Sequence, residues 1–209
     1  MRLLMLLLLL AWPFTAQAGL ADVVARVMPS VVSLEKDGKA YCTGVILNTA
    51  KRHVLTARHC VQGSTFTIGL SDGRTVSARL VGVASIDIAI LQIIEPVLLP
   101  AVQLGNASAL RAGDAVFVVG HPLGYRYTVT AGIVSFVGRD DGDPSGLHIQ
   151  VDAVIHPGNS GGPLFDFDGR LLGINDSAIQ PPGRGHGIGL GFSIPMDAVL
   201  VAVAEIERL

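Results

Sequence analysis

A serine set among three glycines is the segment of this sequence best suited to covalent chemistry. Residues 157–164 read Pro-Gly-Asn-Ser-Gly-Gly-Pro-Leu, so that Gly158, Gly161 and Gly162 surround Ser160. Glycine allows a tight loop whose N–H groups point inward. Such a loop presents the Ser160 hydroxyl, and the amides of Gly158 and Ser160 would form an oxyanion hole in which one donor lowers the barrier by roughly 2.7–4 kcal/mol. The alternative is an ordinary Gly-Ser-Gly turn between strands.

A serine nucleophile needs a base and a carboxylate behind it, and the first half of the chain offers both. His59 follows the strand-like run His53–Ala57, and Asp87 opens the apolar run Ile88–Leu91. A base removes the hydroxyl proton, and the carboxylate fixes the tautomer of the base and stabilises its cation. Asp87 taken alone reads more readily as an ordinary residue at the start of a strand. The order His59, Asp87, Ser160 along the chain is the order of chymotrypsin-type triads.

Two cysteines lie on either side of the strand that leads to His59. Cys42 precedes it and Cys60 is the immediate neighbour of His59. In an exported protein an even cysteine count predicts a disulfide, and the alternative is a pair of unrelated buried thiols. No cluster of histidine, cysteine and carboxylate has metal-ligand spacing, so we expect neither a metal nor another cofactor.

The elements that must position these residues are predicted to be short strands. Runs rich in β-branched residues alternate with Gly, Asp, Asn and Pro, which favours an all-β barrel or sandwich over βα units. The strand-like pattern is interrupted between about Pro96 and Asp114 and then resumes, which predicts a connector between two halves. Asp197 is placed to cap a final helix. The strands are predicted at Val31–Leu34, Tyr41–Leu47, His53–Ala57, Thr65–Leu70, Thr75–Val83, Ile88–Ile93, Ala115–Gly120, Tyr127–Gly138, Leu147–Ala153, Gly162–Phe167, Leu171–Ile174 and Gly187–Ile194.

The N-terminal stretch has the features of a secretory signal peptide. Arg2, an apolar run over residues 3–11 and the small-residue pattern Ala16-Gln17-Ala18 predict cleavage after Ala18, with an uncleaved anchor as the alternative. The formal net charge of the 209-residue chain is −2. That balance predicts no nucleic-acid partner, and no Lys/Arg cluster suggests an anionic membrane surface. We therefore expect an exported protein, periplasmic or extracellular, without stable membrane insertion after cleavage.

Beyond the triad, motifs along most of residues 20–200 make the chain similar to trypsin-like serine proteases, and within them to the HtrA/Deg branch. The resemblance implies two six-stranded antiparallel β-barrels, about 31–98 and about 115–195, in one protease domain over 19–209 that ends in a helix at about 197–209. It also implies a bridged Cys42–Cys60 pair, and we expect this protease to lack a PDZ domain. Segments that carry the resemblance include Asp87-Ile88-Ala89-Ile90-Leu91, Val119-Gly120-His121-Pro122-Leu123-Gly124, Val129-Thr130-Ala131-Gly132-Ile133-Val134-Ser135, Asp152 to Leu164, and Gly191-Phe192-Ser193-Ile194-Pro195.

The substrate pocket follows from the same resemblance. Val154, Ile155 and Ile174 would supply an apolar lining, so we predict a small or medium aliphatic P1 residue. The edge Asn175–Ser177 would pair with the peptide backbone, and Asp176 within it is expected to face outward. His121 and His156 are read as loop or wall residues, not as second bases.

The predicted function is that of an exported serine endopeptidase acting on unfolded or exposed polypeptide through an acyl-enzyme. The alternatives are a catalytically silent peptide-binding module on the same fold and an esterase using the same acyl chemistry. Relatives of the HtrA type often form trimers, but this sequence identifies no interface, so homo-oligomerisation is an open alternative.

Overall fold

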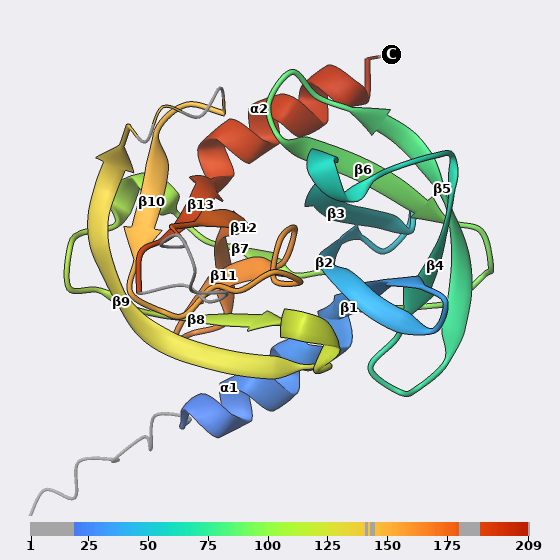
Figure 1. Ribbon diagram of the computed structural model, residues 1–209, viewed down its shortest axis with the longest axis horizontal. Coiled ribbons are helices and arrows are strands. Elements are labelled where there is room, and N and C mark those ends of the chain that lie inside the picture. The colour runs from blue at the N-terminus through green and yellow to red at the C-terminus, as the bar shows by residue number, and fades with distance from the viewer. Residues whose placement is uncertain (1–18, 141, 143–144, 180–188, 209) are drawn as a thin grey trace, which may run out of the picture.

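The computed structural model describes residues 19–140, 142, 145–179 and 189–208, and the predicted signal peptide at 1–18 lies outside them. Strands dominate this part of the chain and divide into two groups side by side (Figure 1). In chain order the elements are α1 (Leu20–Val27), η1 (Met28–Ser30), β1 (Val31–Lys36), β2 (Lys39–Asn48), β3 (His53–Ala57), η2 (Arg58–Cys60), β4 (Thr65–Gly69), β5 (Thr75–Val83), β6 (Ile88–Ile93), β7 (Gln103–Leu104), η3 (Ala107–Ala109), β8 (Ala115–Gly120), η4 (Pro122–Gly124), β9 (Thr128–Arg139), β10 (His148–Val151), β11 (Pro163–Asp166), β12 (Arg170–Ala178), β13 (Gly191–Pro195) and α2 (Met196–Ile206).

The first six strands close into an antiparallel barrel in the order β1-β2-β3-β6-β5-β4. Side chains alternate across a strand, and those that point inward form a core of their own. Leu34, Ile46, Ile68, Leu91 and Ile93 are essentially inaccessible to solvent there. Closure leaves this sheet without a free edge, which holds β3 and the turn carrying His59 firmly in place.

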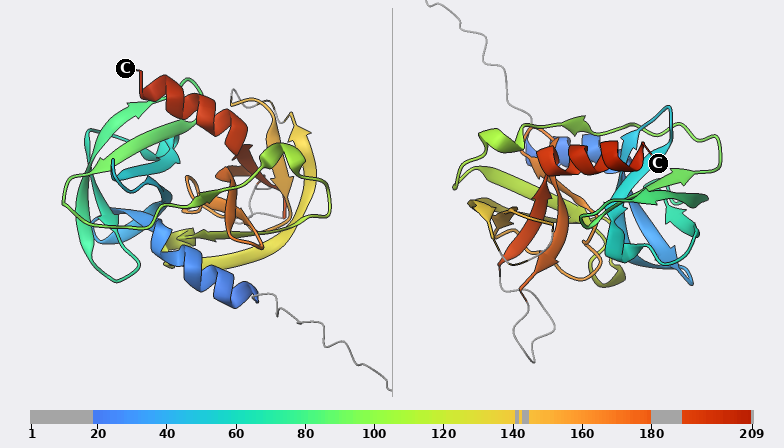
Figure 2. Two further views of the ribbon diagram at one scale, coloured as in Figure 1. Left: turned by 180° about the vertical axis from the view of Figure 1, so that it is seen from behind. Right: turned by 90° about the horizontal axis from the view of Figure 1, so that it is seen from above.

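The second barrel has the strand order β11-β8-β9-β10-β13-β12 and closes through pairing of β11 with β12. The two six-stranded antiparallel barrels predicted from the sequence are thus confirmed. The predicted connector departs from expectation at one point: Gln103–Leu104 form β7, which pairs in parallel with the outer edge of β12. Seen from behind, the connector passes across both barrels before it reaches β8 (Figure 2).

The two barrels share one hydrophobic interface. Val45 and Ile90 of the first barrel belong to the same buried cluster as Phe117 and Phe165 of the second. The two phenylalanine rings pack 5.3 Å apart, within the range of favourable aromatic pairs. A continuous core of this kind fixes the barrels relative to each other, so that loops from both can build one site.

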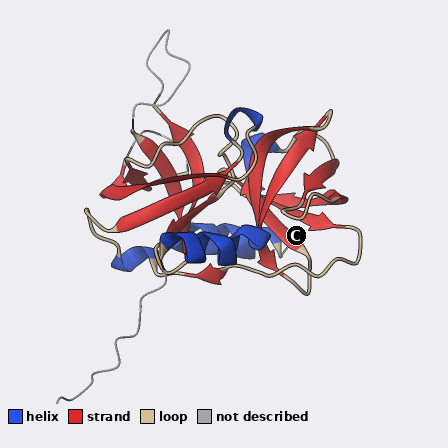
Figure 3. Cartoon of the chain, turned by 90° about the horizontal axis from the view of Figure 1, so that it is seen from below, coloured by secondary structure: helices blue, strands red, loops and turns tan. Residues whose placement is uncertain are grey.

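The two α-helices, α1 and α2, lie on the same side of the barrels (Figure 3). The final helix α2 lies across both of them (Figure 1), burying Val199, Ala202 and Ile206 at helical spacing. It begins at Met196 after Pro195 and ends at Ile206, whereas the sequence predicts a helix over about 197–209. Asp197 makes no capping bond but lies in the first turn, where the helix dipole favours a negative charge. Within the described residues, neither helix is long and apolar enough to cross a membrane.

Candidate active site

The glycine-rich loop around Ser160 lies where the second barrel meets the first. Gly158 and Gly161 have φ angles of +103° and +78°, a region that side-chain-bearing residues rarely adopt. A Cβ on Gly161 would overlap Thr56 Oγ1 and the carbonyl oxygen of Thr43. The backbone N–H of Thr43 donates to the Ser160 carbonyl oxygen at 3.0 Å. Glycine is therefore required here because the loop presses against strands β2 and β3.

Two amides of this loop remain available for a ligand. The N–H of Asn159 donates to the His156 carbonyl at 2.9 Å, and the N–H of Gly162 donates to the Asn159 carbonyl at 2.9 Å. In the described part of the chain, no backbone bond of this kind engages the N–H of Gly158 or Ser160. These are the two donors that the sequence predicts for an oxyanion hole.

His59 and Asp87 form a close hydrogen-bonded pair. The Nδ1 atom of His59 lies 2.6 Å from Oδ2 of Asp87, while the backbone N–H of His59 donates to Oδ1 of the same carboxylate at 2.8 Å. Because Nδ1 faces the carboxylate, the neutral ring carries its proton there, and Nε2 is the unprotonated, basic nitrogen. The side chain of His59 is half exposed and that of Asp87 largely buried.

The loop that carries Asp87 is held from three directions. Its backbone N–H donates to Ser145 Oγ at 3.1 Å, and its carbonyl accepts from Arg58 at 3.1 Å. Two residues earlier, Ser85 donates through both its N–H and its hydroxyl to the Glu205 carboxylate of α2. The position of Asp87 thus depends on contacts remote in sequence.

Burial and hydrogen bonding act in opposite directions on the Asp87 carboxyl. Desolvation is the largest single effect and raises its pKa. Hydrogen bonds with the side chains of His59 and Asp176, together with the positive charge that His59 can carry, lower it and outweigh the burial. The net pKa of Asp87 lies below its usual range, so it stays ionised where an imidazolium ion needs it.

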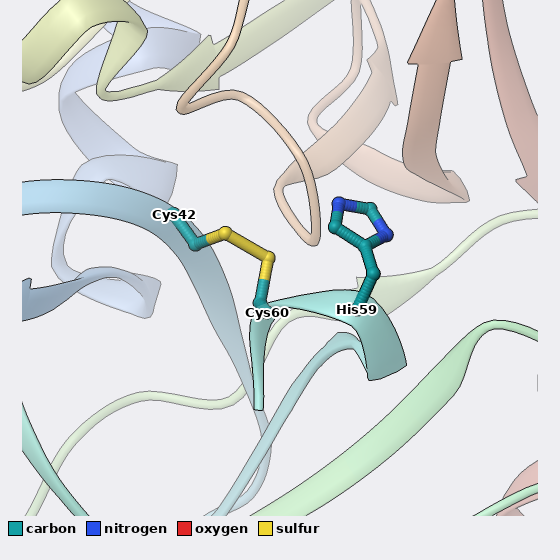
Figure 4. A group of neighbouring side chains, drawn as sticks. All are labelled: Cys42, His59 and Cys60. Atoms are coloured by element: carbon teal, nitrogen blue, oxygen red, sulfur yellow. A yellow bond between two sulfur atoms is a disulfide. The ribbon is translucent and has the colours of Figure 1, made fainter. Parts of the chain in front are cut away.

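The predicted disulfide is present and lies beside His59. Cys42 of β2 is bonded to Cys60 of η2 across a sequence separation of 18 residues. Figure 4 shows the disulfide and the ring of His59 extending from the same short turn. The Cys60 sulfur lies 3.7 Å from the Ser160 carbonyl oxygen. The bridge therefore anchors the histidine turn next to the serine loop.

His59 and Ser160 line one open cleft of about 1060 Å³, together with Gly158 and Tyr41. On the other side of the imidazole ring, a smaller hollow is lined by Asp87 and Asp176. The Ser160 hydroxyl lies 3.2 Å from the Asp176 carbonyl oxygen, to which it can donate. The structure thus brings all three predicted triad residues to the junction between the barrels.

The residues predicted to form the specificity pocket do not line this cleft, and their surroundings differ from one another. Val154 is half-buried, and Ile155 packs against Gly191, where a Cβ would come within 2.7 Å of its Cδ1. Ile174 and Asn175 are fully buried, and Asn175 bonds Pro163 and Ser193 through its side chain. Asn175 also supports the serine loop, because its carbonyl oxygen accepts the N–H of Gly161 at 2.8 Å. The outermost residue of the predicted edge, Ser177, is exposed.

The prediction that Asp176 faces outward is wrong. It is 6% exposed, its Oδ2 lies 3.2 Å from His148 Nε2, and it shares the hollow with Asp87. Strand pairing shifts register between Asn175 and Ser177, a bulge that re-aims the side chain between them. A bulge leaves no signal in the hydrophobic pattern, so neither the inward carboxylate nor its partner His148 could be found from the sequence.

His121 is confirmed as a wall residue and is fully buried behind the serine loop. Its Nδ1 lies 3.0 Å from Thr43 Oγ1, which in turn donates to the Gly158 carbonyl at 2.6 Å. Because that hydroxyl proton is used, Nδ1 must be the protonated ring nitrogen. Burial is the main cause that lowers the pKa of His121 to about 4, and the charge of Arg126 adds to it. His121 is thus neutral at ordinary pH.

Among the residues that the structure describes, two clusters hold donor atoms close enough to consider a metal ion. In the first, Cys42 and Cys60 flank His59, but both sulfurs are consumed by the disulfide. In the second, His59 is joined by Asp87 and Asp176, with all three donor atoms within 4.8 Å of one another. The 2.6 Å contact between His59 and Asp87 is a hydrogen-bond distance and is shorter than two ligands of one tetrahedral zinc ion would allow.

Comparison with known proteins agrees with this geometry. The family described as Trypsin-like peptidase domain matches residues 42–174. The chain belongs to this family. The solved structure of the HtrA-type protease AlgW with a tripeptide superposes on this chain with a TM-score of 0.81 at 36% identity. The match covers 91% of this chain and 64% of the AlgW chain.

Curated relatives place the chain in the HtrA branch. The periplasmic pH-dependent serine endoprotease DegQ of Escherichia coli is 37% identical, across 91% of this chain and 50% of its own length. A probable periplasmic serine protease of Haemophilus influenzae, named do/HhoA-like, is 41% identical across 78% of this chain and 36% of its own length. The chain thus spans about a third to a half of these relatives.

Proposed function

We propose that this protein is an exported serine endopeptidase that uses His59, Asp87 and Ser160 as its catalytic triad. The observation that carries the proposal is the 2.6 Å pair of His59 and Asp87, whose imidazole lines the same cleft as Ser160. The names of the relatives, serine proteases and endoproteases of the periplasm, support the same activity and an exported location.

In the proposed mechanism, His59 Nε2 takes the proton of Ser160 Oγ as the oxygen attacks the scissile carbonyl carbon. The amides of Gly158 and Ser160 stabilise the oxyanion. The C–N bond breaks as His59 returns its proton to the leaving amine, and an ester on Ser160 remains. A water molecule then attacks this acyl-enzyme with His59 again as base, the ester C–O bond breaks, and His59 returns the proton to Ser160 Oγ as the carboxylic acid product leaves. Asp87 stays ionised throughout and stabilises the imidazolium ion.

We propose that the substrate is unfolded or exposed polypeptide. β11 pairs with β12 only as far as Ile174, so the edge from Asp176 to Ala178 can accept an extended peptide strand. Val154 and Ile155 provide apolar surface for a small or medium aliphatic P1 side chain, and the backbone of Ile174 and Asn175 completes the wall. Burying such a side chain contributes roughly 1.5–3 kcal/mol. We further propose that residues 1–18 are a signal peptide and that residues 19–209 form one protease domain.

The test is covalent labelling with a fluorophosphonate. Wild-type protein should be labelled and should cleave casein, and Ser160→Ala should do neither. Ser71→Ala is the matched control, since Ser71 is an exposed serine on the turn between β4 and β5 and does not line the cleft. Mass spectrometry of peptides released from a denatured protein mixture then gives the P1 preference. A correctly folded wild-type protein that binds peptides but is not labelled would instead support the binding module, and turnover of short esters without casein cleavage would support the esterase.

A further inference from the structure

A second carboxylic acid lies directly behind the proposed triad. Asp176 and Asp87 line the same hollow, and their oxygens, with a ring nitrogen of His59, all lie within 4.8 Å of one another. Asp176 is buried and projects from the β12 bulge. The mechanism described above gives this group no role, although it is one of the two carboxyl groups nearest to His59.

Two carboxylates at this separation cannot both carry a charge without a large cost. Equal charges repel strongly where water is largely excluded, so one of the two acids keeps its proton. Asp87 receives the backbone N–H of His59 and its ring Nδ1, both of which favour the ionised form. The proton therefore belongs on Asp176, and a protonated carboxyl group can donate to its neighbour.

The burial of Asp176 favours the neutral acid. Among the described residues, the charged or titratable groups around the hollow are Arg58 and His59 on η2 and Asp87 before β6, with His148 facing Asp176 from β10. Arg58 directs its guanidinium to the carbonyl oxygens of Ala84 and Ser85. His148 is itself buried, 1% exposed, against the ring of Phe192. A charged imidazolium there would lose its hydration, so His148 serves best as a neutral neighbour of Asp176 Oδ2.

We propose that Asp176 is a positioning residue that remains protonated at the working pH and donates a hydrogen bond to Asp87, holding this carboxylate in line with His59. The inference deepens the proposed function and rests on it. A hydrogen bond between the two side chains also contributes to the lowered pKa of Asp87. Asparagine at position 176 would supply the same neutral donor, whereas alanine would supply none.

The first experiment compares the pH dependence of kcat/KM for wild type, Asp176→Asn and Asp176→Ala. In Asp176→Asn we expect activity within about threefold of wild type and the same midpoint of the acid limb, because no charge has been removed. In Asp176→Ala we expect kcat to fall at least tenfold with little change in KM. Asp168→Asn removes an exposed carboxylate on the β11–β12 turn and is the matched control. An acid-limb midpoint lowered by a pH unit or more in Asp176→Asn would mean that Asp176 is ionised and would overturn the proposal.

A second measurement does not depend on activity. Carbon-13 NMR of protein labelled at the aspartate carboxyl carbons, with Asp176 assigned by its absence in Asp176→Asn, reports the protonation state directly. We expect this resonance to remain that of a neutral acid at pH 7. If Asp176 of the wild-type protein titrates in the ordinary aspartate range, near pH 4, the proposal is refuted. This result does not depend on whether the variants are active or fold well. Failure of fluorophosphonate labelling would instead reject the proposed function and leave this readout intact.

Discussion

Replacement of His121 should change how the stability of the protein depends on pH. Its pKa falls from an ordinary 6.5 to about 4, mainly through burial. The structural reason is visible in its bonds: Nδ1 contacts Thr43, whereas Nε2 has no hydrogen-bond partner among the described residues. Protonation would place a second N–H on Nε2 in a site without an acceptor for it.

The sign and size of the effect follow from these two values. Above pH 6.5 the ring is neutral in both the folded and the unfolded chain, so the full stability is present. Between pH 6.5 and about 4 the unfolded chain binds a proton that the folded chain does not, so stability falls as the pH falls. Below about 4 both states are protonated. A difference of this size corresponds to about 3 kcal/mol of unfolding free energy.

The assay is urea unfolding followed by far-ultraviolet circular dichroism at several pH values between 7.5 and 4. In His121→Asn the residue cannot titrate, so the loss of stability across this range should be smaller than in wild type by about 3 kcal/mol. If His121→Asn also loses packing, its unfolding free energy falls by the same amount at every pH. This loss does not affect the result, because only the change of the unfolding free energy with pH is compared between the two proteins. Parallel losses in the two proteins would show that His121 does not resist protonation and would refute the argument.

Three further changes test the site. Asp87→Asn should lower kcat by about 10⁴-fold, measured with a peptide substrate, because the amide favours the wrong tautomer of His59. The double change of Cys42 and Cys60 to serine should lower the unfolding free energy by about 3 kcal/mol, since the bridge spans 18 residues. Gly158→Ala should lower kcat by about 10²–10³-fold with KM nearly unchanged, because a Cβ would overlap a carbonyl oxygen behind the loop and disturb the oxyanion donors.

Each of these predictions has a clear opposite. Near-normal turnover in Asp87→Asn would remove this carboxylate from the triad. Unchanged urea midpoints in the cysteine variant would mean that the bridge does not constrain the unfolded chain. A rise in KM without loss of kcat in Gly158→Ala would indicate that the loop binds substrate but does not stabilise the oxyanion.

Much of the fold and the separate parts of the site could be predicted from the sequence, because they depend on local patterns. The short strands follow from alternating β-branched residues between turn residues, and this alternation survives in β4 and in the first half of β5. The glycines around Ser160 are required by a tight backbone at that place, which makes the loop recognisable without any neighbour. The two cysteines and their position beside His59 also predict a bridge.

Which residues lie next to one another depends on the packing of distant segments, and that packing is visible only in the folded protein. The sequence of Gln103 and Leu104 shows no strand pattern, so the parallel pairing of β7 with β12 could not be predicted from it. The sequence identifies Asp176 as an acid near the cleft but predicts that it faces outward. The direction of the Asp176 side chain depends on a one-residue bulge and on His148 from another strand. Such contacts between distant segments are set by packing, and the local periodicity of the sequence carries no information about them.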